Sequence, residues 1–405
     1  MAKNDSKISY TVFCNRGGHN MNSEYTKWVA CWGNATSIRN QTDCIYAKDL
    51  TLRYPLRMVF DGCALRLHFS NLTGTEPVRF YANIARSLSD KEIDPDTLKQ
   101  VTVKGSACIV LEPKEEAVSD EVAFDITAGE TISVSLFMEG YNQMNAGVLI
   151  TGPLSKGFYS YGNFMNDREL PMDLTRKTNW FYFLNTVDIL TEEKNHALIC
   201  YGDSITAQSW PDYLTIRAWE EGYRNVSIIR RAVSGTRILR QYDNITYAAY
   251  GLKGETRFPI EMNTAGADAV LIQHGINDII HPVGTDVNPF RPWSDLPTAE
   301  DMEEGFTRIY IDYARKLGMK VWGGTLIPIF GWRTYEPFRE DLKNAFNDWL
   351  RTTDLLDGCV DFDQAIRDPE HTPAFAQGYD SGDHLHPSEE GYKAMAYAVD
   401  SELLK

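Results

Sequence analysis

Long apolar runs are absent from this sequence. Nowhere do about 18 apolar residues follow one another, the length that a membrane-spanning helix needs. The first residues, Met-Ala-Lys-Asn-Asp-Ser-Lys, lead into no apolar segment of the kind found in secretory signal peptides. We therefore expect a cytoplasmic protein without a membrane partner, although removal of a signal peptide would leave the same sequence.

Cysteine is sparse, and cofactor motifs are missing. Seven cysteines are scattered over 405 residues without a CxxC pair, which argues against a disulfide framework and a cysteine zinc site. We expect reduced, mostly buried thiols. The sequence also has no GxGxxG or P-loop motif and no His and Asp cluster with convincing metal-ligand spacing. We therefore expect neither a cofactor nor a metal.

Positive charge is in the minority. The 40 basic residues stand against 56 acidic ones, which gives a formal charge of −16. This balance argues against nucleic acids and anionic membranes as partners. The length of 405 residues exceeds the roughly 250–300 at which a single hydrophobic core stops growing, so we expect two domains.

Short alternating segments fill the N-terminal half, which we assign to residues 1–193. They are separated by turn-forming residues at regular spacing and predict an all-β sandwich of the jelly-roll kind. Such a domain serves as a scaffold or binds carbohydrate, and the aromatic stretch 158–165 belongs either to the core or to a sugar-stacking surface. The predicted strands are 57–60, 64–69, 78–84, 100–103, 107–111, 122–126, 131–137 and 179–190.

Strands and helices alternate in the C-terminal half, residues 194–405. Apolar runs such as 269–274 have the length of buried strands, whereas 300–318 spaces its apolar residues as an amphipathic helix does. The alternation predicts a parallel sheet in a three-layer α/β/α domain. The predicted strands are 197–202, 226–230, 269–274 and 320–326, and the predicted helices are 210–219, 300–318 and 335–350.

Reactive side chains follow the predicted parallel strands. The first strand ends in Gly202-Asp203-Ser204, the second is followed by Gly235, and the third by Gly275-Ile276-Asn277-Asp278. The carboxyl ends of parallel strands meet at one edge of a sheet, where α/β folds place their reactive groups. We predict Ser204 as a nucleophile, and the N–H groups of Ser204 and Gly235 with the Asn277 amide as oxyanion donors.

A base for Ser204 is predicted far along the chain. His386 is the predicted base, and Asp383, three residues earlier, can orient its imidazole if the segment makes a helical turn. His384 is a rival for this role, but the spacing to Asp383 and the proline after His386 favour His386.

Three further residues are candidate substrate contacts. His274 directly precedes Gly275, and Trp332 and Arg333 lie just past a predicted strand end. Each of them either lines the pocket, where Trp332 and Arg333 could contact an acyl or sugar group, or packs within the protein.

Taken in order, the blocks 202–204, 235, 275–278 and 383–387 give the chain a resemblance to the SGNH, or GDSL-type, hydrolase family. The resemblance covers most of the C-terminal half and implies an α/β/α esterase or lipase, with Ser204, His386 and Asp383 as a triad and the same three oxyanion donors. Residues 323–326, 357–363 and 379–392 look like the bacterial branch with an N-terminal β-domain. Ile205 stands where the family motif has Leu, a volume-conserving change.

Together these features predict a serine esterase that removes acetyl groups from oligosaccharides through an acyl-enzyme, as many relatives of this resemblance do. An esterase or lipase for lipid or small acyl esters is the alternative within the same class. A carbohydrate-binding protein with an inert hydrolase half is the alternative from another class. The partner is thus a small-molecule or oligosaccharide ester, while the sugar and the oligomeric state do not follow from the sequence.

Overall fold

The computed structural model describes residues 25–35, 37–38, 45–241 and 251–405. Its first fifteen strands are antiparallel and form three sheets, with the orders β1-β15-β4-β8, β13-β12-β3-β10-β5-β6 and β14-β11-β2; β9 pairs with β4, and β7 with β5. Their bounds are β1 Lys27–Gly33, β2 Ser37–Ile38, β3 Tyr46–Arg57, β4 Gly62–Ser70, β5 Val78–Arg86, β6 Lys99–Val101, β7 Ile109–Leu111, β8 Glu116–Val118, β9 Val122–Ile126, β10 Thr131–Gln143, β11 Ala146–Leu149, β12 Gly157–Tyr161, β13 Arg176–Thr178, β14 Trp180–Tyr182 and β15 Leu184–Thr191.

Alternating burial explains why these segments form sheets with one face in the core. Along β9, Val122, Phe124 and Ile126 are buried while the residues between them are exposed. This period of two is the pattern that predicted the sandwich, and the N-terminal fold class is confirmed.

The structure contradicts one N-terminal strand prediction and shows two environments within the aromatic stretch 158–165. The strand prediction for 57–60 is wrong, because β3 ends at Arg57 and residues 58–60 are a buried connection to β4. A short apolar run has the same sequence pattern in both settings. In the stretch 158–165, Phe158 is buried in the sheet, whereas Tyr161 on the same strand is 60% exposed.

The C-terminal half is built on a five-stranded sheet of order β17-β16-β18-β19-β20, in which every pairing is parallel. Its strands are β16 His196–Gly202, β17 Val226–Ala232, β18 Ala267–Gln273, β19 Lys320–Gly324 and β20 Gly358–Val360. The helices are α1 Trp210–Glu220, α2 Gly254–Glu261, α3 Ile276–Ile280, α4 Ala299–Phe306, α5 Asp312–Lys316, α6 Pro337–Thr352, α7 Phe362–Ile366 and α8 Glu389–Ala398. The three-layer α/β/α prediction is confirmed.

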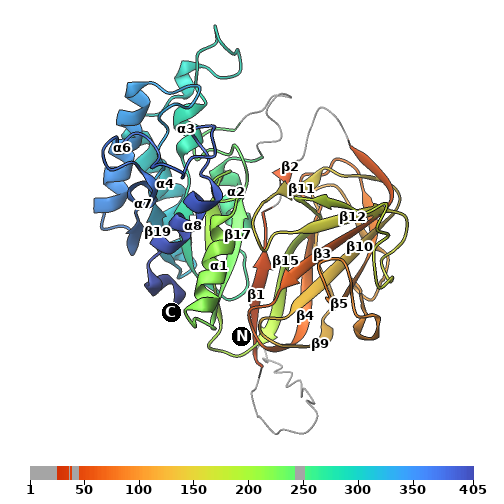
Figure 1. The fold of residues 1–405 in the computed structure, drawn as a ribbon. Coiled ribbons are helices and arrows are strands. Elements are labelled where there is room, and N and C mark those ends of the chain that lie inside the picture. The colour runs from red at the N-terminus through yellow and green to blue at the C-terminus, as the bar shows by residue number, and fades with distance from the viewer. Residues whose placement is uncertain (1–24, 36, 39–44, 242–250) are drawn as a thin grey trace, which may run out of the picture.

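The helices pack in two groups, which Figure 1 shows beside the sandwich. Helix α8 packs on α1 and α7, whereas α4 packs on α6, and α2 contacts η4, Thr307–Ile311. The predicted helix 300–318 is continuous in the structure, but its hydrogen-bond pattern changes along its length. The α-helices α4 and α5 are joined by a π-helical stretch, η4. The continuous helix begins with a capping box between Thr298 and Asp301, as the sequence pattern indicates. None of the helices in these described ranges is long and apolar enough to cross a membrane.

Strand β1 joins the two halves. Its Ala30 N–H donates to the carbonyl of Ala265 at 2.9 Å, and the Ser227 hydroxyl on β17 donates to the Ala30 carbonyl at 2.6 Å. Gly33 is needed here, because a Cβ atom would lie 2.6 Å from the side chain of Ile229. Buried apolar residues therefore form one cluster that runs from the sandwich into the α/β half.

Between β15 and β16 the chain leaves the antiparallel sheet and enters the parallel one, so the predicted boundary at residues 193 and 194 falls in this short connection. The five cysteines in the described ranges are free thiols, three of them buried; Cys14 and Cys44 lie outside those ranges.

Candidate active site

Ser204 lies in a tight turn directly after β16, the central one of three adjacent strands. The backbone of Gly202 approaches its neighbours so closely that a Cβ atom would lie 2.4 Å from the Gln273 carbonyl oxygen, which only glycine permits. The Asp203 carboxylate then accepts the Ile205 N–H at 3.1 Å and fixes the turn. Strand, glycine and turn together hold the Ser204 hydroxyl at the edge of the sheet.

His386 connects Ser204 to Asp383. Its Nε2 lies 2.8 Å from the Ser204 Oγ, and its Nδ1 lies 2.6 Å from the Asp383 Oδ2. A carboxylate only accepts, so Nδ1 carries the proton and the Nε2 lone pair accepts the serine hydroxyl. The structure therefore brings these three predicted residues together in one hydrogen-bonded chain.

Asp383 is held by its own loop as well as by the imidazole. Burial raises the pKa of Asp383, but the hydrogen bond from His386 and the backbone N–H groups of His386 and Leu385 outweigh it, so the pKa lies below its usual range. The carboxylate thus stays ionised and available to orient His386.

Gly235 and Asn277 flank Ser204 from the neighbouring strands. Gly235 follows β17 and has a φ of 76°, a left-handed conformation that suits glycine. Asn277 lies on α3, just after β18, and its amide donates to the Thr236 carbonyl at 3.0 Å. An amide has two N–H donors, so one of them remains after this bond.

Thr236, which the sequence reading overlooked, links the parts of this region. Its carbonyl accepts from both Asn277 and His274 Nε2, the latter at 3.1 Å. His274 Nδ1 accepts from the Tyr310 hydroxyl at 2.7 Å, and the side chain is fully buried. Burial, and then the charge of Arg257, lower the pKa of His274 to about 3. Both ring nitrogens thus have partners within the protein, which favours packing, the second of the two alternatives for His274.

Two more carboxyl groups lie under the site. Asp278 accepts the N–H groups of Ile238 and Leu239 at 2.8 and 3.0 Å, and burial raises its pKa to about 6. Burial raises the pKa of Asp203 to about 7, and its Oδ2 has no hydrogen-bond partner among the described residues. Both side chains hold loop backbone in place.

Arg257 on α2 ties the two loops together from below. Its guanidinium donates to the Gly202 carbonyl at 3.3 Å, to the Thr236 hydroxyl at 2.8 Å and to the Arg231 carbonyl at 3.1 Å. Glu261, one turn later on the same helix, accepts two further bonds at 3.1 and 2.9 Å. The spacing of four residues is visible in the sequence, but nothing in it indicates which carbonyls the arginine meets.

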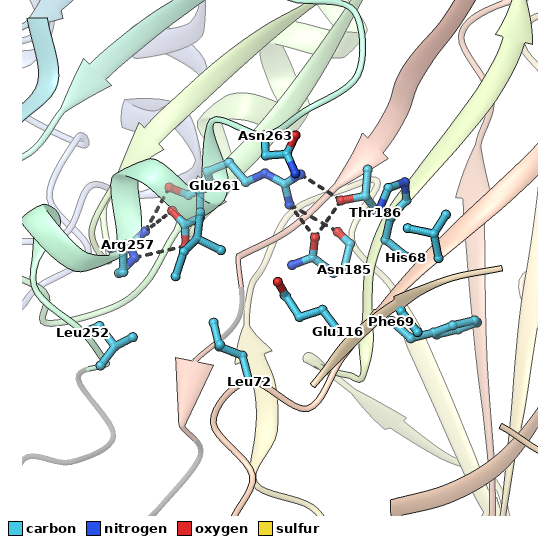
Figure 2. Close-up of a pocket in the computed structure, with 14 residues that line it drawn as sticks. His68, Phe69, Leu72, Glu116, Asn185, Thr186, Leu252, Arg257, Glu261 and Asn263 are labelled. Atoms are coloured by element: carbon cyan, nitrogen blue, oxygen red, sulfur yellow. Dashed lines mark hydrogen bonds and ion pairs between the residues drawn. The ribbon is translucent and has the colours of Figure 1, made fainter. Parts of the chain in front are cut away.

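The same pair borders a cavity of about 140 Å³ between the two halves (Figure 2). On the other wall, the Arg231 guanidinium donates to the Asn185 and Thr186 side chains of β15 at 3.1 and 2.8 Å. Neither this cavity nor a smaller one between the halves is lined by Ser204 or His386. The sandwich thus contacts the base of the site through Arg231 and Arg257.

His384 bonds Asp380 at 2.5 Å through its Nδ1, whereas the histidine that bonds Ser204 is His386. The φ of 64° at His384 shows that the chain turns sharply here, which separates the two histidines. Trp332 is half-buried, and the exposed Arg333 stacks on it at 4.6 Å, in a loop whose Gly331 lies against the His384 ring.

Comparison with known proteins gives a family for this part of the chain. Residues 200–394 match the model of the GDSL-like Lipase/Acylhydrolase family. No match was found among curated protein sequences.

Several solved structures resemble about half of the chain. A GDSL-like lipase from Bacteroides thetaiotaomicron is 16% identical over 52% of this chain and 89% of its own, with a TM-score of 0.33. A mutant acetyl esterase with acetate ion is 17% identical over 51% and 96%, with a TM-score of 0.35. A lipolytic G-D-S-L family protein from Veillonella parvula is 16% identical over 50% and 95%, with a TM-score of 0.31.

The matched segment contains every predicted site residue from Ser204 to His386, and it coincides with the parallel α/β/α half of the chain. The family match supports hydrolase activity on esters. Most of the C-terminal half of this chain is therefore similar to the GDSL-like Lipase/Acylhydrolase family.

Proposed function

We propose that this protein is a serine esterase that removes acetyl groups from carbohydrate through an acyl-enzyme. The observation that carries the proposal is the hydrogen-bonded chain from Ser204 Oγ through His386 to Asp383, with distances of 2.8 and 2.6 Å. A nucleophile within reach of a base, which a third group orients, is the arrangement that acyl transfer requires.

The proposed reaction begins when Ser204 Oγ attacks the ester carbonyl carbon. His386 Nε2 takes the hydroxyl proton, and Asp383 stabilises the imidazolium without taking a proton itself. The N–H groups of Ser204 and Gly235 and the remaining Asn277 amide hydrogen are the proposed donors to the oxyanion.

His386 next gives its proton to the leaving alcohol, and an acyl group stays on Ser204. Water then attacks the acyl carbon while His386 Nε2 takes a proton from it. His386 returns this proton to Ser204 Oγ as the bond between Oγ and the acyl carbon breaks and the carboxylic acid leaves. The groups that take part are the side chains of Ser204, His386, Asp383 and Asn277, two backbone N–H groups and water.

The small acyl group of the proposal follows from the sequence resemblance. The two cavities between the halves are not lined by Ser204 and do not define an acyl-binding space. Gly235 and Asn277 are both buried beside Ser204. The carbohydrate part of the proposal follows from the sequence resemblance.

The proposal is tested with Ser204→Ala and a chromogenic acetate ester. Loss of the nucleophile is expected to lower kcat by about a million-fold. Ser106→Ala, which removes an exposed hydroxyl of the sandwich, is the matched control. Unchanged hydrolysis by Ser204→Ala would exclude the mechanism.

Two substrate series decide the finer points. Rates on acetyl and longer acyl esters distinguish an acetylesterase from a lipase, since faster turnover of long chains contradicts the small acyl group. Acetate release from acetylated xylan, mannan and pectin oligosaccharides then identifies the sugar, and no release from any of them contradicts the carbohydrate substrate.

A further inference from the structure

We infer that Trp332 and Arg333 form an anion subsite that selects esters carrying a carboxylate beside the ester bond. This inference rests on the proposed esterase function and deepens it, because it names the substrate class. Three features support it: the anchoring of the loop, the availability of the guanidinium, which stacks on Trp332, and the charge around it.

The loop that carries both residues is anchored on either side of the site. Gly331 lies so close to the ring of His384 that a Cβ atom would be 2.8 Å from its Cγ. The Thr334 hydroxyl donates to the carbonyl of Ile280 at 2.8 Å, at the end of α3. His384 shares its loop with the base His386, and α3 carries Asn277. The loop of Trp332 and Arg333 therefore contacts the loop that carries the base on one side and the helix that carries Asn277 on the other.

The guanidinium of Arg333 is available for a ligand. The residue is exposed, and in the described part of the chain no carboxylate lies within ion-pair distance of it. It stacks on the half-buried Trp332 at 4.6 Å, and two backbone bonds hold Trp332, to Ile329 at 3.1 Å and from Tyr335 at 2.7 Å. Stacking limits the rotamers of the arginine, so less freedom is lost on binding.

The surrounding charge favours an anion, although the chain as a whole is acidic. The pKa of His281, directly after α3, lies well below its usual range because of burial and then because of four nearby guanidinium groups, those of Arg291, Arg237, Arg333 and Arg339. The nearby carboxylate of Asp295 pairs with Arg237 at 3.5 Å and Arg240 at 3.7 Å, and not with Arg333.

A carboxylate is the ligand that this group recognises best. Arginine presents parallel N–H donors that match the two oxygens of a carboxylate, and such charge-assisted bonds are stronger than bonds to neutral hydroxyls. An acetyl ester of an acidic sugar is one substrate with this chemistry.

The experiment compares para-acetoxybenzoate with its uncharged methyl ester. For each, kcat/KM is divided by the rate of alkaline hydrolysis, which removes the intrinsic difference in reactivity, and the ratio of the two values measures preference for the anion. We expect Arg333→Gln to lower this ratio about tenfold or more. Arg333→Lys should lower it less, because lysine keeps the charge but loses the paired donors.

Arg79→Gln is the control, since it removes an exposed positive charge from β5 of the sandwich. Its ratio should stay within about twofold of the wild type, because distant exposed charges are screened. An unchanged ratio in Arg333→Gln would overturn the subsite while the proposed function stands. If the wild type hydrolyses neither ester, the proposed function itself fails and the subsite with it.

Discussion

Two regions that meet at Ser204 differ in their exposure to solvent and in the direction in which the pKa values of their carboxyl groups are shifted. The loop 380–388 is largely exposed: the side chains of His386 and Asp383 are 23% and 44% accessible. The region beneath Ser204 is closed to solvent, and Asp203, His274 and Asp278 are all at most 1% exposed.

Their carboxyl groups respond in opposite directions. Hydrogen bonds from His386 and the loop backbone keep the pKa of Asp383 low despite partial burial. Under Ser204 burial dominates and raises the pKa of Asp203 to about 7 and that of Asp278 to about 6. The exposed loop is thus suited to moving protons, while the buried region is suited to holding backbone in place.

The largest effect on kcat is expected when the two histidines of the exposed loop are replaced one at a time. His386→Ala removes the proposed base, and we expect kcat to fall about a million-fold. His384→Asn should stay within about threefold, because His384 bonds Asp380 and asparagine tolerates its left-handed backbone. Steady-state kinetics on an acetate ester measures both. A loss of kcat in His384→Asn as large as that in His386→Ala would contradict this assignment of roles.

A smaller effect is expected from the buried region. Arg257→Lys keeps the charge but loses the bonds that join the Gly202 and Thr236 loops, and kcat should fall about tenfold with little change in KM.

Arg53→Lys is the matched control for that variant. Arg53 is also fully buried and donates to several carbonyls, but it lies in the sandwich. Both variants should lower the melting temperature, and only Arg257→Lys should lower kcat. An equal drop of kcat in both, measured well below either melting temperature, would show that Arg257 acts through stability alone.

The last expected effect is on stability and not on the rate. The folded pKa of Asp203 is raised, so its contribution to stability is fully present below the unfolded value of 3.8 and is lost as the pH rises towards about 7. Asp203→Asn abolishes this titration.

The free energy of unfolding, measured by urea denaturation between about pH 4 and pH 8, should therefore shift in favour of Asp203→Asn as the pH rises. The shift amounts to about 1.4 kcal/mol for each unit by which the pKa is raised. A difference between the two proteins that stays constant over this pH range would contradict buried ionisation at Asp203.

The sequence alone was sufficient for the elements with strong local patterns. Apolar runs located β16, β17 and β18, and the motif order located Ser204, Gly235, Asn277, Asp383 and His386. Asp383 and His386 are three residues apart, so a single turn of chain brings their side chains together. The short apolar segment 57–60 was misread because a buried connection and a strand share the same composition.

Only the tertiary structure decided the contacts between residues far apart in the chain. Ser204 and His386 are 182 positions apart, and Arg257 reaches Gly202 over 55. His274 became a core residue because Thr236 and Tyr310 occupy both ring nitrogens, and Arg333 became available because Gly331 and Thr334 anchor its loop. Local patterns report backbone preference and burial, whereas partners are chosen only when the strands have assembled.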